Sequence, residues 1–216
     1  MDNSYAAGEG AYGRRVHWDR LFENLEGQLA AEWESERAAL DAESERLRIS
    51  RLELRTRLRI LCAASTPATL DLPGHRVRTR LESLGADWVA AAMTDGEGSS
   101  SRAVRIIPLH AIMGLSVDHG LLLSSLEENE STPPSLRERM TLGFLLRDFA
   151  RRRVPVRIIV VDGADLHGTV DRAGADHLDL AIHDPGTARL AGAVQSFRML
   201  PFAATASIKT VGAQMP

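Results

Sequence analysis

The chain has 216 residues, of which 44% are hydrophobic and 25% are charged, a composition that is ordinary for a globular protein. Its net charge of -3 argues against a general nucleic-acid coat, because such proteins carry a strongly basic surface. Cys62 is the only cysteine, so no disulfide can form within the chain, and no stretch approaches the roughly 20 apolar residues that cross a bilayer. We therefore expect a soluble, cytoplasmic protein that makes no use of a membrane.

The N-terminal part is predicted to be a tail followed by a helix. Residues 1–15 lack the apolar stretch of a secretory signal and are expected to form a disordered tail. Residues 16–63 contain no proline and only one glycine, Gly27, which favours one long charged helix. Apolar residues recur at every seventh position while the complementary positions are polar, so this stripe is half of a coiled-coil seam. The stripe consists of Trp33, Leu40, Leu47, Leu54 and Leu61.

The charges of this predicted helix are segregated. Six acids and one arginine lie between Glu32 and Glu45, and six arginines and one acid lie between Arg46 and Arg59. In two antiparallel copies of this helix, the acidic half of each copy would face the basic half of the other, and the two helices would cross near Leu47. The alternative is a single solvated helix with ion pairs four residues apart, each worth a few tenths of a kcal/mol. In the oligomeric interpretation the contact residues are Trp33, Leu40, Leu47 and Leu54.

The remainder of the chain contains an internal repeat. Residues 74–93 align with residues 163–182, and residues 105–111 align with residues 198–204. The identical positions are Gly74, Gly85, Ala86, Asp87 and Ala92 in the first copy and Gly163, Gly174, Ala175, Asp176 and Ala181 in the second. Both copies show the alternation of half-buried strands, and Asp162-Gly163 is a hairpin signal.

The fold class predicted from this repeat is α+β: a long N-terminal helix followed by two small β-barrels, each preceded by a helix. The first barrel covers 66–117 and the second, with its helix, 135–211. Residues 118–134 form a linker and 212–216 a tail. Ser135 and Glu138 are spaced as a capping box at the start of the second helix.

The pattern of the second copy resembles the Sm-like family, which includes the Sm and LSm proteins and the RNA chaperone Hfq. The resemblance rests on a helix, an apolar strand, Leu166-His-Gly168-Thr-Val170 and Asp176-His-Leu178-Asp-Leu180. The first copy matches less closely, since Thr79 replaces the glycine found at Gly168. The whole arrangement is similar to uncharacterised proteins of high-GC Gram-positive bacteria. The label of Fis-family regulator that some of them carry finds no support, because 154–211 is predicted as strands and not as a helix-turn-helix.

The resemblance implies RNA recognition near two turns of each barrel, but the residues needed are missing. Neither Pro108-Leu109-His110 nor Pro201-Phe202-Ala203 contains the basic pair of the family. Asp179 stands about where Sm proteins place an asparagine, and an acid there would repel phosphate. The resemblance therefore extends to the fold and not to the usual RNA pocket.

Other candidate sites are weighed against simpler interpretations. A phosphate-contacting patch would consist of Arg147, Arg151, Arg152, Arg153 and Phe202. The alternatives are arginines that complement the helix dipole and a phenylalanine that closes a core. Six further residues have metal-ligating side chains but match no metal motif, so we predict no metal and no cofactor. They are Asp165, His167, His177, Asp179, His183 and Asp184.

No nucleophile elbow, phosphate loop or tuned pair of carboxylates is recognisable, so we expect no enzyme. The leading expectation is a non-enzymatic scaffold or adaptor that self-associates through its helix and barrels, as a homo-oligomer that also contacts an unidentified protein. The alternative is a nucleic-acid-binding regulator, for DNA or RNA, of the Sm-like type.

Overall fold

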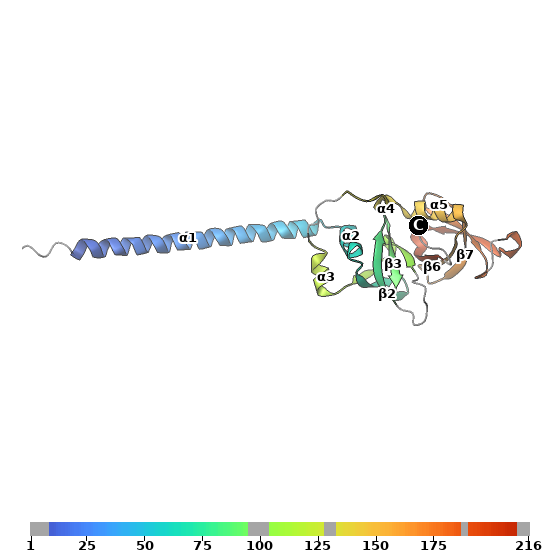
Figure 1. Ribbon diagram of the computed structural model, residues 1–216, viewed down its shortest axis with the longest axis horizontal. Coiled ribbons are helices and arrows are strands. Elements are labelled where there is room, and N and C mark those ends of the chain that lie inside the picture. Colours follow the sequence, from blue (N-terminus) through green and yellow to red (C-terminus); the bar gives the residue numbers. More distant parts are fainter. Residues whose placement is uncertain (1–8, 95–103, 128–132, 187–189, 211–216) are drawn as a thin grey trace, which may run out of the picture. The chain divides into compact units, whose positions relative to one another are not determined.

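A computed structural model describes residues 9–94, 104–127, 133–186 and 190–210. The chain divides into two units, residues 1–52 and residues 53–216. In outline the protein is α+β with a long N-terminal helix, as the sequence predicts, and its described strands form a large antiparallel sheet (Figure 1). None of the described helices is long and apolar enough to cross a membrane.

The segment 16–63 is not one helix, as predicted, but two. Helix α1 (Glu9–Ser50) ends where the backbone N–H of Leu52 donates to the carbonyl of Ile49 (3.0 Å), and α2 (Leu54–Ala63) begins after an extended Glu53. No proline or glycine marks the break. Helix α2 instead buries Leu58, Leu61 and Cys62 in the core of the second unit, and this packing sets its position.

The described residues of the second unit form ten strands and several short helices. In chain order they are β1 (Pro67–Leu72), β2 (His75–Leu84), β3 (Trp88–Met93), β4 (Val104–Pro108), β5 (Gly114–Ser116), α3 (His119–Ser124), α4 (Leu136–Arg139), α5 (Leu142–Arg152), β6 (Pro155–Val160), β7 (Asp165–Ala173), β8 (His177–Ile182), β9 (Ser196–Pro201) and β10 (Thr205–Thr210). The strands form one antiparallel sheet in the order β5-β1-β2-β3-β4-β10-β6-β7-β8-β9. Because the sheet is continuous, the two separate barrels expected from the sequence are not confirmed.

Two other expectations need adjustment. The predicted linker contains α3, whose N-terminus is capped by the side chain of Asp118. The predicted second helix is divided at Met140, whose extended backbone separates α4 from α5. The capping box is confirmed, since Ser135 accepts from the N–H of Glu138 and the Glu138 carboxylate accepts from the N–H of Ser135.

The two halves of the sheet have the same internal order, β5-β1-β2-β3-β4 and β10-β6-β7-β8-β9. Their registers also agree. Leu81 lies opposite Ala91, with a bulge between Leu81 and Ser83, and the aligned Val170 lies opposite Leu180, with a bulge between Val170 and Arg172. A bulge at the same place in both halves shows that the repeat is one of backbone geometry as well as sequence.

The turns and helices repeat too. The N–H of Leu109 donates to the carbonyl of Asp87 (2.9 Å), and the N–H of Phe202 donates to that of Asp176 (2.7 Å). Helices α2 and α5 are each followed closely by a residue in the left-handed conformation, Ser65 (φ 47°) and Arg153 (φ 55°). We therefore define a first repeat, residues 54–117, and a second repeat, residues 142–210, each with one helix and five strands.

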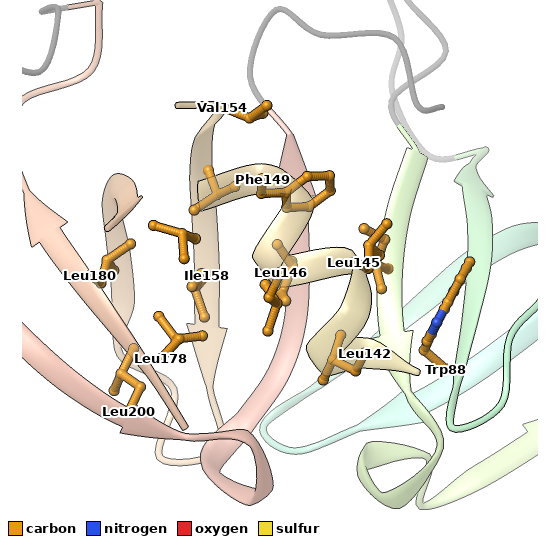
Figure 2. Close-up of a cluster of buried hydrophobic side chains, with 14 of the residues drawn as sticks. Trp88, Leu142, Leu145, Leu146, Phe149, Val154, Ile158, Leu178, Leu180 and Leu200 are labelled. Carbon is orange, nitrogen blue, oxygen red and sulfur yellow. The ribbon is translucent and has the colours of Figure 1, made fainter. Parts of the chain in front are cut away.

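Each repeat has an aliphatic core, but the second core reaches into the first repeat. The first core gathers residues of α2 and β1–β4, among them Leu58, Leu70 and Leu81. Figure 2 shows α5 lying between strands of the two repeats, with Leu142 and Leu145 on the side of Trp88. The Trp88 indole N–H donates to the carbonyl of Met140 (2.9 Å). The two repeats are thus packed together as one body.

Candidate interaction surfaces

The joint between the repeats is a pairing of two strands. Strand β4 is the fourth strand of the first repeat, and β10 is the fifth strand of the second. Ile208 lies opposite Ile106 and Lys209 lies opposite Arg105. This pairing buries Ile106 almost completely, at 1% exposure, in the core of the second repeat.

The strands that correspond to this pair are the two edges of the sheet. Strand β9 is the fourth strand of the second repeat, and β5 is the fifth strand of the first; neither has a partner on its outer side in the described sheet. Met199 of β9 is the residue that aligns with Ile106, and it is 73% exposed. Phe197, which aligns with the half-buried Val104, is 64% exposed. The β9 edge therefore exposes large apolar side chains at positions whose counterparts on β4 are covered by the β4–β10 pairing.

Helix α1 presents the predicted apolar stripe to solvent. Every side chain from residue 22 to residue 50 is exposed apart from the half-buried Arg48. Trp33, Leu40 and Leu47 are 69%, 72% and 47% exposed. Leu54, the fourth predicted contact residue, is exposed but lies in the second unit as the first residue of α2.

Three arginines from the basic half of the predicted helix lie in α2 and bond within the second unit. The Arg55 guanidinium donates to three backbone carbonyls, those of Gly85 (3.3 Å), Ala86 (3.1 Å) and Glu138 (2.7 Å). Arg59 forms an ion pair with the Glu138 carboxylate (2.6 Å). Arg57 donates to the hydroxyl of Ser125. The continuous helix over 16–63 on which the antiparallel dimer was based is therefore not present, and these three arginines already have partners within the chain.

Three of the four arginines predicted to contact phosphate form ion pairs within the protein. Arg151 and Arg152 both pair with Asp148, at 2.5 Å and 3.3 Å. Arg153 pairs with Asp171 (2.8 Å). The spacing of Asp148 predicts its pairing, because residues three and four apart share a helix face. The pairing with Asp171 depends on the tertiary structure, because α5 must first pack on β7.

Arg147 and Phe202 also have structural partners. Arg147 donates to the carbonyl of Gly174 (3.2 Å). Phe202 is half-buried, packs on the second core and lies beside Gly143 of α5. The simpler interpretation of Phe202, as a residue that closes a core, fits this position better than an exposed base-stacking platform.

The cluster of histidines and acids is organised by hydrogen bonds within the protein. His183 is buried, with Nε2 2.9 Å from the Thr169 hydroxyl and Nδ1 3.1 Å from the carbonyl of Asp184. The His167 ring packs edge-on against His183, with 5.3 Å between the ring centres. Within the described residues, no three histidines, cysteines or acids are grouped as metal ligands would be.

Cys62 is buried in the first core, where burial and then the charge of Glu138 raise the pKa of its thiol to about 12. The thiolate is the reactive form of cysteine, so this side chain is an inert part of the core.

Sequence reasoning did not identify Phe197 and Met199, although one signal was available. In the repeat alignment Met199 takes the place of Ile106, and both lie on strands with an apolar face. The alignment does not contain the order of the strands in the sheet. That order decides that Ile106 is covered by a neighbouring strand and that Met199 is not.

Comparisons of the chain with protein-family models, with curated proteins and with solved structures gave no match. The surfaces described above are therefore interpreted from their own geometry and chemistry.

Proposed function

We propose that this protein is a non-enzymatic scaffold that self-associates through the free edges of its sheet and through α1. The observation that carries the proposal is the contrast between Ile106 and Met199: one position of the repeat is covered by a strand and the other is 73% exposed. Exposed apolar edge strands are liabilities unless another strand covers them. A second copy of this chain offers the strand that fits.

Each repeat is proposed to be a small barrel of the Sm-like type. Support comes from the content of the repeat, one helix and five strands, and from the shared order and shared bulge of its two copies. If β9 of one chain pairs with β5 of the next as β4 pairs with β10, Met199 lies opposite Leu115 of the second copy and Arg198 opposite its Ser116. Such a contact is head-to-tail, so repetition produces a ring or a filament.

Helix α1 supplies the second proposed contact. Its exposed stripe of Trp33, Leu40 and Leu47 has no partner among the described residues of its own unit, and a long helix of this kind gains most of its stability from burial of such a stripe. The ion pairs Arg46–Glu43 and Arg48–Glu45 lie within the helix, which leaves the apolar stripe as the basis for self-pairing.

Nucleic-acid binding through α5 is the weaker proposal. Arg151, Arg152 and Arg153 form ion pairs with Asp148 and Asp171, and Arg147 donates to a carbonyl, so each of these arginines already has a partner within the protein. Phe202 is also turned toward a core and not toward solvent.

The test is the molar mass of the full chain, measured by light scattering after gel filtration over a range of concentrations. We expect an oligomer for the wild type and a smaller species for the double variant Phe197→Asp/Met199→Asp, because two charges on the β9 edge disfavour strand pairing. Leu136→Asp is the matched control, since Leu136 is 81% exposed but lies on α4, away from both edges.

A second variant separates the two contacts. Leu40→Glu/Leu47→Glu is expected to remove pairing through α1 and to leave pairing through β9 intact, so that only the combination of all four changes gives a monomer. A wild-type chain that remains monomeric at high micromolar concentration contradicts the proposal, as does a β9 variant with the mass of the wild type.

A further inference from the structure

A row of basic side chains crosses the joint between the repeats. Lys209 of β10 lies opposite Arg105 of β4 on one side and opposite Arg157 of β6 on the other. Directly opposed residues of an antiparallel sheet project from the same face, with Cβ atoms about 4.5–5.5 Å apart. These three residues, the junction cluster, therefore lie side by side on one face of the sheet.

The row continues across the second repeat with two histidines. Arg157 lies opposite His167 of β7, and the N–H of His183 donates to the carbonyl of His167 (3.3 Å). The His183 ring is held by Thr169 and by the carbonyl of Asp184, so it fixes the position of the His167 ring against which it packs. His167 thus provides an additional polar group at the end of the junction cluster.

The cluster has more positive than negative charge. Asp165 accepts from Arg157 through both carboxylate oxygens, at 2.8 Å and 2.9 Å from Nε, and so neutralises one of the three cations. Within the described part of the chain, no carboxylate forms an ion pair with Arg105 or Lys209, and the Arg105 Nε is buried without a hydrogen-bond partner. Burial lowers the pKa of Arg105, and the nearby charge of Arg157 lowers it further, whereas the charge of Asp165 acts in the opposite direction.

Like charges on opposed strands destabilise a sheet, so this arrangement costs stability unless an anion binds. The corresponding row of the first repeat is different. There Ser116 aligns with Lys209, Thr69 with Arg157 and Arg78 with His167, and these residues are paired in the same way. The charge is therefore a property of the junction and not of the repeated scaffold.

We propose that Arg105, Lys209 and Arg157 form a binding site for a phosphate group. A planar guanidinium beside a lysine ammonium is a combination that proteins use to hold phosphate oxygens. The phosphate belongs either to a free phosphate compound or to a nucleic-acid backbone, since both present the same anion. This site is independent of self-association, because none of its residues lies on β9 or α1.

Lys209 is the only lysine of the chain, which gives a direct probe. Reductive methylation with ¹³C-formaldehyde labels Lys209 and the N-terminal amine, and it keeps their positive charge. We expect inorganic pyrophosphate to shift the Lys209 methyl resonance in a saturable manner and to leave the N-terminal resonance unchanged. Equal shifts of both resonances, or no shift at millimolar pyrophosphate, overturn the proposal.

Variants test the residues in the full chain. Arg105→Gln and Lys209→Gln are each expected to weaken pyrophosphate binding by roughly tenfold, the loss that follows when a charged hydrogen bond of about 1.5 kcal/mol is removed. Arg151→Gln is the control, since Arg151 is 78% exposed and lies on α5. An equal loss in the control means that binding is non-specific, and the proposal then fails.

A fluorescein-labelled single-stranded RNA distinguishes the sources of the phosphate. Binding of pyrophosphate alone assigns the site to a free phosphate compound. Binding of the RNA, competed by pyrophosphate and weakened by Lys209→Gln, assigns it to a nucleic-acid backbone, with affinity that falls as salt rises. Circular dichroism of each variant checks that its secondary structure is retained, because a loss of binding supports the proposal only in a folded variant.

Discussion

The first and second repeats have one backbone plan and different side chains at matched positions. Strand order, bulges and turn hydrogen bonds agree, while Thr79 stands where the second repeat has Gly168, and Trp88 where it has His177. The Trp88/His177 difference occurs where the two halves have different neighbours: Trp88 is buried beside α5 and donates to the carbonyl of Met140, whereas His177 is 45% exposed. The two repeats therefore share one strand register, whereas the local surroundings of each position decide which side chain fits there.

The largest effect is expected at the position of Gly168 and Thr79. A Cβ at Gly168 would lie 2.2 Å from the backbone oxygen of Ala181, so Gly168→Ala must move a strand and is expected to cost about 2–3 kcal/mol of unfolding free energy. Thr79→Ala removes a methyl group and a hydroxyl that donates to the carbonyl of Ala68, at about 1–2 kcal/mol. Urea denaturation measures both. Equal losses would show that the two strand pairs are packed alike.

The second test compares two glycines at the same turn. A Cβ at Gly85 would lie 2.3 Å from the Trp88 ring, which is 3% exposed and held by its bond to Met140, so Gly85→Ala is expected to cost about 2 kcal/mol. A Cβ at Gly174 would meet the His177 ring, which can turn toward solvent, so Gly174→Ala should change stability by less than about 0.5 kcal/mol.

Thermal unfolding of the two variants checks this difference. A large loss for Gly174→Ala would mean that His177 is held as firmly as Trp88. Because the second core includes Trp88, we expect a single cooperative transition in both variants and not a separate melting of one repeat.

The smallest effect concerns Cys62, which aligns with Ala150 of the second helix. The pKa of its thiol is raised from 9.0 to about 12, so native protein should resist iodoacetamide at pH 8.5 and react fully in urea. The folded state holds the thiol proton more tightly, so this contribution to stability is complete below about pH 9 and is lost as the pH rises toward 12. Rapid alkylation of folded protein would show that α2 opens locally.

The proposed self-association and phosphate binding extend the comparison of the two repeats to their surfaces. Both depend on positions at which the repeats differ in exposure or charge, Ile106 against Met199 and Ser116 against Lys209. Neither difference follows from the repeat pattern, since the aligned residues share the same local strand geometry.

The sequence predicted the repeat, the locations of its strands and the capping box, because these depend on local alternation, turn residues and spacing along the chain. It did not predict the end of α1 at Ser50, since no local residue breaks the helix there. It also left a phosphate-contacting patch as an alternative for the arginines of α5, because the partner of Arg153, Asp171, is 18 residues away and approaches only after folding.

Hydrophobic periodicity and glycine positions are local properties of the chain, and they were enough to predict two related copies of a five-strand module after residue 63. The pairing of β4 with β10, which joins the copies into one sheet, depends on the tertiary fold. This pairing covers Ile106, leaves Met199 at an edge and brings Arg105, Lys209 and Arg157 into one row. Local patterns do not predict it, because strand pairing acts between residues far apart in the chain. Alternation fixes which face a side chain takes, whereas its neighbour on the next strand depends on how the strands are ordered.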